Sequence, residues 1–186
     1  LEWHKKLAAD KTLEVKVLPA FRPDKTVNIE KPGFVEYVAE MEKACGRKIA
    51  TLGDMKTALA LRLDYFGENG CRVSDHGLDY CVCSPADEKE LDSILAKALA
   101  GEPVTQEEAD QYKTGRRRFL GEEYAKRGWV MQIHFGCLRN NNSAMFRKLG
   151  PDTGYDAMGN SEGAARLAGF LNCLEERGAL PKTILY

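Results

Sequence analysis

Ionisable residues stand at the ends of three apolar runs in this sequence. Arg22 closes the run 15–22, Asp75 lies near the end of 71–77, and His134 follows the apolar residues that begin at Trp129. Such runs are typical of strands buried on both faces of a parallel sheet. Ligands bind at the carboxyl ends of parallel strands, so these three side chains predict a site that binds a ligand or acts on it.

The segments between these runs show helical periodicity with helix start and stop signals. Thr51 with Asp54, and Thr105 with Glu108, have the spacing of capping boxes, and Gly46 is a stop signal. The tail of a helix is expected at 1–11 and a polar loop, rich in Gly and Asn, at 140–160. The expected strands are 13–21, 71–75, a central strand from 129, and 181–186. The expected helices are 33–44, 51–66, one that follows 84–86 and ends at Gly101, 105–127 and 161–177.

This alternation of strands and helices predicts an α/β fold with a parallel sheet and right-handed crossovers. Periodicity allows either an open doubly wound sheet or a contiguous part of a (β/α)8 barrel. The barrel is favoured because Arg22, Asp75 and His134 then open into one mouth. The whole of 1–186 is expected to be a single segment of such a barrel domain, with an extra helical insertion at approximately 85–128.

Composition narrows the classes of partner. The chain has 186 residues and a net charge of −1, which gives no reason to expect nucleic acid or an anionic membrane as partner. No apolar run approaches the roughly 20 residues of a membrane span, and no signal peptide is visible, so we expect a cytoplasmic protein. The first residue is leucine and the last residues resemble an unfinished strand, so we expect an excerpt from a longer protein.

Other motifs have structural interpretations. Six cysteines without regular spacing fit reduced thiols, and the pair Cys81 and Cys83 lacks the second pair of a zinc site. Arg116–Arg118 is interpreted as a solvated helix face rather than a phosphate patch. Residues 150–163 lack the Gly-Lys-Ser/Thr ending of a phosphate loop, so nucleotide binding is not expected.

Several long motifs in one order resemble the uronate (glucuronate) isomerase family of the amidohydrolase superfamily. The resemblance covers essentially the whole chain, and a set of motifs is far more specific than any one of them. It implies a TIM-type (β/α)8 barrel, of which this chain would form about strands four to seven. The motifs are Phe21–Asp24, Arg72–Gly77, Gln132–Gly136, Leu138–Asn142, Leu149–Asp156 and Leu180–Tyr186.

The resemblance also implies a reaction and a metal. The family interconverts D-glucuronate with D-fructuronate, and D-galacturonate with D-tagaturonate, by moving a proton from C2 to C1 through an enediol. Its divalent metal, usually zinc, is held by a His-x-His pair on the first strand and an aspartate on the eighth, and neither is present here. No metal ligand is therefore expected within this segment, and independent activity is not expected of it.

Four residues match the family's site positions. Arg22 and Arg139 resemble its arginines after the fourth and sixth strands, which would bind the acidic sugar. Asp75 and His134 resemble its fifth-strand aspartate and sixth-strand histidine, which would take part in proton movement and contact a substrate oxygen. His76, beside Asp75, is interpreted as structural.

Two alternatives stay open. The segment could belong to a hydrolytic amidohydrolase relative, although two arginines aimed at an acidic sugar argue against this. It could also be a non-catalytic half-barrel that binds acidic sugars weakly and forms homo-oligomers through its open sheet edges.

Overall fold

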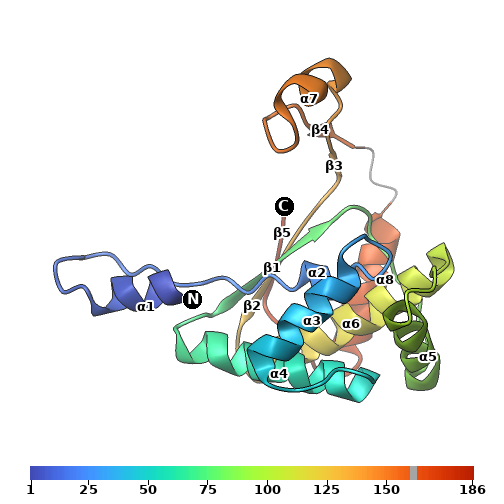
Figure 1. The fold of residues 1–186 in the computed structure, drawn as a ribbon, viewed down its shortest axis with the longest axis horizontal. Coiled ribbons are helices and arrows are strands. Elements are labelled where there is room, and N and C mark those ends of the chain that lie inside the picture. Colours follow the sequence, from blue (N-terminus) through green and yellow to red (C-terminus); the bar gives the residue numbers. More distant parts are fainter. Residues whose placement is uncertain (160–162) are drawn as a thin grey trace.

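The computed structural model describes residues 1–159 and 163–186 (Figure 1). Parallel strands form its centre, and most of the helices lie on one side of them. The strands are β1 (Val73–Leu78), β2 (Val130–Phe135), β3 (Cys137–Leu138), β4 (Ala157–Met158) and β5 (Thr183–Leu185). The helices are α1 (Glu2–Ala9), α2 (Asp24–Val27), α3 (Phe34–Cys45), α4 (Leu52–Glu68), α5 (Glu88–Leu99), α6 (Gln106–Lys126), α7 (Ser143–Leu149) and α8 (Ala164–Glu175).

The main sheet has the strand order β1-β2-β5, and both pairings are parallel. Phe21 extends the sheet beyond β1 by a single parallel bridge to Ser74. The strand expected at 13–21 is therefore wrong except at its last residue. Val15 and Val17 in this segment are 66% and 41% exposed, because only Phe21 reaches a neighbouring strand with which its backbone can pair.

The two faces of the sheet differ because successive side chains of a strand point to opposite sides. On β1, Ser74, His76 and Leu78 are buried, while the residues between them are half-buried. On β2, Met131 and Ile133 are buried in the same alternation. The buried face packs against the helices and includes the polar residues Ser74 and His76, whereas the half-buried face carries Asp75, Gln132 and His134.

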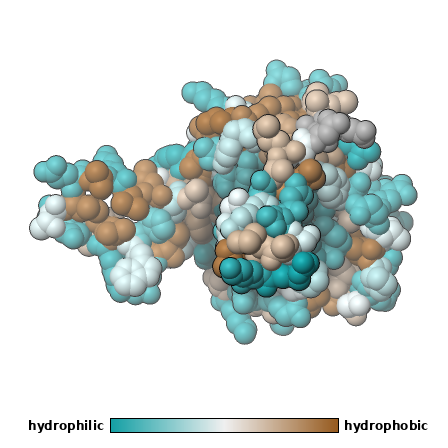
Figure 2. All heavy atoms as spheres, turned by 90° about the horizontal axis from the view of Figure 1, so that it is seen from above, coloured by the Kyte–Doolittle hydropathy of each residue, from teal (hydrophilic) through white to brown (hydrophobic). Residues whose placement is uncertain are grey.

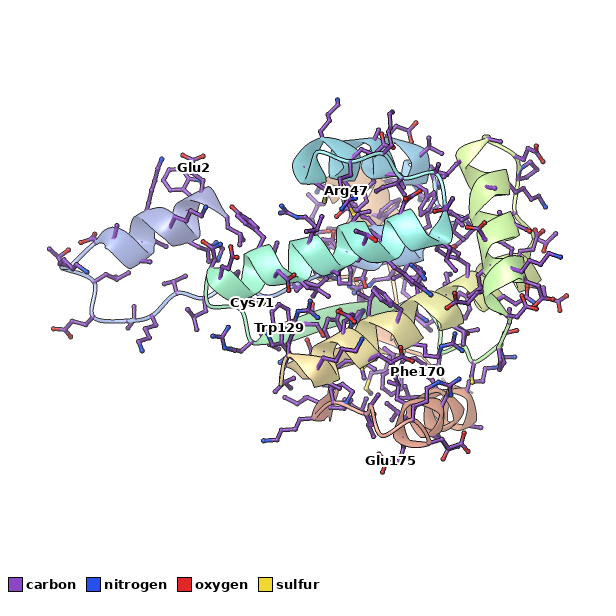
Figure 3. The ribbon with its side chains drawn as sticks, turned by 90° about the horizontal axis from the view of Figure 1, so that it is seen from below. Glu2, Arg47, Cys71, Trp129, Phe170 and Glu175 are labelled. Atoms are coloured by element: carbon purple, nitrogen blue, oxygen red, sulfur yellow. The ribbon has the colours of Figure 1, made fainter. Side chains whose placement is uncertain are left out.

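Helices α3, α4, α6 and α8 lie on one side of the strands (Figure 1). The predicted capping boxes at Thr51 and Thr105 are confirmed, since both side chains accept a hydrogen bond from the N3 amide. Gly46 ends α3 with a φ of 64°, which only glycine adopts without strain. Cys71 and Trp129 lie close together near the amino ends of β1 and β2, and Phe170 is a buried residue of α8 (Figure 3).

Helix α6 buries two arginines. Arg116 is 0% exposed and Arg117 is 7% exposed, so the interpretation of Arg116–Arg118 as a solvated face is wrong for these two residues. The guanidinium of Arg116 lies 5.6 Å from the Tyr112 ring centroid and 5.4 Å from that of Phe119. Burial is possible because the arginine stem is apolar and its planar head stacks on aromatic faces.

The segment after β2 has more structure than the polar loop predicted for 140–160. Strands β3 and β4 form an antiparallel pair, and α7 lies between them at the top of Figure 1. The Asn142 side chain caps α7 by accepting a hydrogen bond from the Met145 amide. The beginning of the helix predicted from Ser161 lies outside the described residues, and its remainder is α8.

The amino-terminal helix α1 and residues 10–17 stand away from the body (Figure 1). Figure 2 shows apolar side chains along this arm, and among its apolar residues Val15 is 66% and Val17 is 41% exposed. Among residues 1–159 and 163–186, no helix is both long enough and apolar enough to cross a membrane.

Candidate functional site

The register of the sheet brings three predicted site residues to one face. Gly77 pairs with His134 and Asp75 pairs with Gln132, so Asp75 and His134 point to the same side of the sheet. The backbone of Phe21 exchanges hydrogen bonds with Val73 and Asp75 at 3.0 and 2.9 Å. This bridge places Arg22 beside Asp75 on the same face.

The side chains of Arg22, Asp75 and His134 approach one another closely. Arg22 Nη1 lies 3.6 Å from Asp75 Oδ2, and Arg22 Nη2 lies 3.5 Å from His134 Nε2. The distance from His134 Nε2 to Asp75 Oδ2 is 3.6 Å. A guanidinium, a carboxylate and an imidazole thus meet at the carboxyl end of β1 and β2.

Gly77 provides the space for this cluster. A Cβ atom at residue 77 would lie 2.8 Å from Arg22 Nη2, closer than Cβ atoms come to other atoms in folded proteins, and would make a tight contact of 3.0 Å with His134 Nε2. Any larger residue at this position would therefore displace Arg22, His134 or both.

Asp24 belongs to the site although the sequence reasoning assigned it no role. Its Oδ2 accepts hydrogen bonds from Arg22 Nε and from the Gly77 amide, both at 3.0 Å. Burial acts to raise the pKa of Asp24, but its contacts with His76, Gly77 and Arg22 outweigh burial and lower the pKa. The signal in the sequence was its place two residues after Arg22, at the start of a helix.

Tyr186 is a second site residue to which the sequence reasoning gave no role. Its ring stacks on His134 with a centroid separation of 5.5 Å and an interplanar angle of 10°. Its hydroxyl donates a hydrogen bond to Asp75 Oδ1 at 3.0 Å, and this bond raises the pKa of Tyr186. Tyr186 continues the β2–β5 ladder, because its amide donates to the Ile133 carbonyl at 3.1 Å.

Arg139 reaches the site from a different element. It follows β3, and its Nη1 donates to Asp156 Oδ2 at 2.8 Å. The bond to Asp156 raises the pKa of Arg139. A cavity of about 460 Å³ is lined by residues that include Arg22, Asp24, His134, Arg139 and Tyr186. Asp75 is not among the lining residues, and it lies behind Arg22 and His134 in contact with both.

His76 points away from the cavity into the core. It is 2% exposed, and its Nε2 lies 3.1 Å from the Tyr124 hydroxyl. Its Nδ1 is 3.6 Å from Asp24 Oδ1. Complete burial lowers the pKa of His76, and the neighbouring Asp24 opposes this shift only in part. His76 therefore lies beneath the carboxylate of Asp24, on the core side of the sheet.

The donor set does not fit a resident metal ion. Within residues 1–159 and 163–186, no three His, Cys, Asp or Glu side chains gather closely enough to hold one. Cys81 and Cys83 are both free thiols, and burial raises the pKa of each. The ionisable groups that this segment brings to the site are those of Arg22, Arg139, Asp24, Asp75 and His134.

Comparisons with known proteins agree along the full length of the sequence. A family model described as Glucuronate isomerase matches residues 1–186. A uronate isomerase of Lachnoclostridium phytofermentans is 48% identical over 186 residues, which are 100% of this chain and 40% of the relative. A uronate isomerase of Caldanaerobacter subterraneus subsp. tengcongensis gives the same identity and the same coverage. The chain spans about 40% of the length of these curated relatives.

Two solved structures share the fold. The crystal structure of uronate isomerase from Thermotoga maritima has a TM-score of 0.89 and 36% identity, covering 100% of this chain and 41% of that one. The glucuronate isomerase of Caulobacter crescentus has a TM-score of 0.85 at 24% identity, covering 100% of this chain and 38% of that one. The predicted fold class, parallel α/β units that form part of a TIM-type barrel, is confirmed.

Proposed function

The chain belongs to the glucuronate isomerase family, and from this premise we propose that it supplies the substrate-binding wall of a uronate isomerase. The substrate would be D-glucuronate or D-galacturonate in the acyclic form, converted to D-fructuronate or D-tagaturonate. The observation that carries the proposal is the meeting of Arg22, Asp75 and His134 within 3.5 to 3.6 Å on one face of the sheet.

The two arginines would hold the acidic sugar. A guanidinium presents a planar pair of donors that matches a carboxylate or two vicinal oxygens. Arg22 and Arg139 line the same cavity, and they come from different elements of the fold. An extended uronate has a carboxylate at one end and hydroxyls along its length, so two separated guanidinium groups suit it.

Asp75 and His134 would move protons. Aldose–ketose isomerisation transfers a proton from C2 to C1 and needs donors for the oxygen that becomes negative on the way. His134 Nε2 lies between a donor, Arg22, and an acceptor, Asp75. This nitrogen can make one hydrogen bond at a time, so its partner can change when the substrate replaces Arg22 or Asp75.

From the family resemblance we infer that the intact protein binds a divalent metal, usually zinc. We also infer that it belongs to the amidohydrolase superfamily. The described residues offer no set of three ligands for such an ion, so the steps proposed here involve the side chains of this segment only. A cytoplasmic location and a homo-oligomeric assembly are further parts of the proposal.

A chimera tests the function. Residues 1–186 would replace the matching 41% of the Thermotoga maritima uronate isomerase, and ketose formation from D-glucuronate and D-galacturonate would be measured. We expect turnover that falls at least about tenfold in Arg22→Lys, because lysine cannot offer the planar pair of donors. Arg47→Lys, on the turn after α3, is the control with unchanged turnover. A folded chimera without isomerase activity would contradict the proposal.

The same assay applied to residues 1–186 alone separates two hypotheses. Turnover by this polypeptide would contradict the expectation that the segment is inactive on its own. Binding of D-glucuronate without turnover would agree with that expectation, and a titration followed by NMR measures it.

A further inference from the structure

Asp24 joins three parts of the fold around the site. Its Oδ2 accepts from Arg22 Nε and from the Gly77 amide at 3.0 Å each. Its Oδ1 lies 3.6 Å from His76 Nδ1 in the core. A single carboxylate therefore links the segment that carries Arg22, the carboxyl end of β1, and the layer beneath the sheet.

Asp24 holds Arg22 by one particular nitrogen. The Nε atom makes the short contact, whereas the terminal nitrogens lie 3.6 Å from Asp75 Oδ2 and 3.5 Å from His134 Nε2. Those two distances are longer than an ordinary hydrogen bond. The terminal pair is the edge of the guanidinium that a sugar carboxylate would occupy. Asp24 thus fixes Arg22 through Nε and leaves the terminal nitrogens with only these two longer contacts.

The surroundings keep this contact in place. The Asp24 side chain is 18% exposed, and that of Arg22 is 56% exposed. A long side chain in solvent would otherwise sample many rotamers and lose that freedom when it binds a ligand. The Gly77 amide fixes the carboxylate because it belongs to a strand, and the carboxylate in turn fixes the guanidinium.

We propose that Asp24 is a positioning residue that orients Arg22 for the acidic sugar, an inference that rests on the proposed function. Asp24 acts through Arg22, so its loss weakens substrate binding more than turnover. An aspartate that only begins helix α2 would instead change stability and leave the Michaelis constant of the folded enzyme unchanged.

Kinetics of the chimera test this role. We expect Asp24→Ala to raise KM for D-glucuronate about tenfold, while kcat changes less than about threefold, because the lost contact serves binding throughout the reaction. Asp24→Asn keeps one side-chain oxygen as an acceptor and should recover most of the loss. Asp64→Ala is the matched control, since Asp64 accepts from Arg127 Nε at 3.1 Å on helix α4.

A double substitution separates positioning from a local structural effect. In the Arg22→Lys background the Nε contact no longer exists, so adding Asp24→Ala should raise KM by less than about twofold. If the KM increases caused by Arg22→Lys and by Asp24→Ala multiply in full in the double variant, the proposal is overturned. Thermal melts identify any variant that fails to fold, and Asp24→Asn then takes its place in the cycle.

Hydrogen exchange at Arg22 Nε needs no turnover, so it tests this inference separately from the proposed function. In residues 1–186 the Arg22 Nε–H should exchange with solvent more slowly than the Nε–H of Arg47, and Asp24→Ala should remove the difference. Equal exchange with and without Asp24 would refute the positioning role whatever the enzyme does. A wild-type chimera that isomerises nothing would refute the proposed function and leave the exchange result valid.

Discussion

Gly77 stands directly opposite His134 in the β1–β2 register, and it is the absence of a side chain there that lets Arg22 and His134 meet. Its amide also donates to Asp24. One residue thus serves the site through both its backbone hydrogen bond and its small size.

Replacing this glycine should separate function from stability. In Gly77→Ala the new Cβ would lie 2.8 Å from Arg22 Nη2, and the guanidinium is the free end of a flexible side chain that can move away. We expect the melting temperature to stay nearly unchanged and the affinity for D-glucuronate to fall about tenfold through the lost Arg22 contact. Titration calorimetry of the chimera measures the affinity.

The control for this substitution is Gly53→Ala in the first turn of α4. Its nearest neighbour would be Thr51 Oγ1 at 3.7 Å, an ordinary contact. A comparable loss of affinity in Gly53→Ala, or full affinity in Gly77→Ala, would contradict the steric argument.

Removing the buried charge of Arg116 should stabilise the fold. Within the described residues, Nε, Nη1 and Nη2 of Arg116 are all buried without a hydrogen-bond partner. Burial lowers the pKa of Arg116, which reflects the cost of keeping the charge out of water. We expect Arg116→Met to raise the free energy of unfolding by about 1–3 kcal/mol, because methionine keeps the apolar stem without the charge.

Urea denaturation measures this gain. Arg118→Met is the matched variant, since the Arg118 side chain is 22% exposed and lies 4.0 Å from Glu122; its effect should stay within about 0.5 kcal/mol. A destabilised Arg116→Met would mean that stacking on Tyr112 and Phe119 outweighs desolvation.

Stability should fall as the pH drops below the ordinary pKa of histidine. Burial lowers the pKa of His76 from its ordinary value of 6.5, so below that pH the unfolded state binds a proton that is absent from the folded state. Stability is therefore lost as the pH falls from 6.5 towards the lowered pKa, with a slope of up to about 1.4 kcal/mol per pH unit. His76→Gln should reduce this slope, which urea melts at several pH values would reveal.

Asp24 adds to this loss at lower pH. Its pKa is lowered from 3.8, so the stability that it contributes is present above that value and disappears as the pH falls below it. Between pH 5 and 6.5, roughly one proton is expected to bind when the wild type unfolds. If the free energy of unfolding had the same pH dependence in the wild type and in His76→Gln over this range, the assignment to His76 would be contradicted.

Residues 1–186 are expected to associate in solution. Apolar side chains are exposed on the arm and on β5, including Val15 at 66% and Ile184 at 47%. The outer edges of the sheet also have few backbone partners. Such edges and patches promote pairing between polypeptides. Sedimentation velocity should show a mass that rises with concentration, and Val15→Lys with Val17→Lys should reduce it. A monomer at all concentrations would contradict this expectation.

The sequence predicted those features that depend on local chemistry. The capping boxes of Thr51 and Thr105 and the stop at Gly46 are local, and all three are present in the structure. Arg22, Asp75 and His134 could be grouped because parallel strands end at one edge. Their roles in catalysis and binding stay predictions.

Other features depend on partners distant in the sequence. The apolar residues of 13–21 predict a strand, yet only Phe21 has a strand beside it. Arg116 is expected to be solvated because charge normally lies in water, whereas its aromatic neighbours allow burial. The contacts of Asp24 with Gly77 and of Tyr186 with Asp75 span 53 and 111 positions, and no local pattern reports them.

The β3–α7–β4 excursion carries Arg139 together with its partner Asp156. Arg22, by contrast, is anchored to the sheet through Asp24 and Gly77. The two arginines are therefore positioned by different parts of the fold. The position of Arg22 depends on the register of the strands, whereas that of Arg139 depends on the length and composition of residues 137–158. Changes in residues 137–158 can therefore move the second guanidinium while the first keeps its contacts with Asp24 and the sheet.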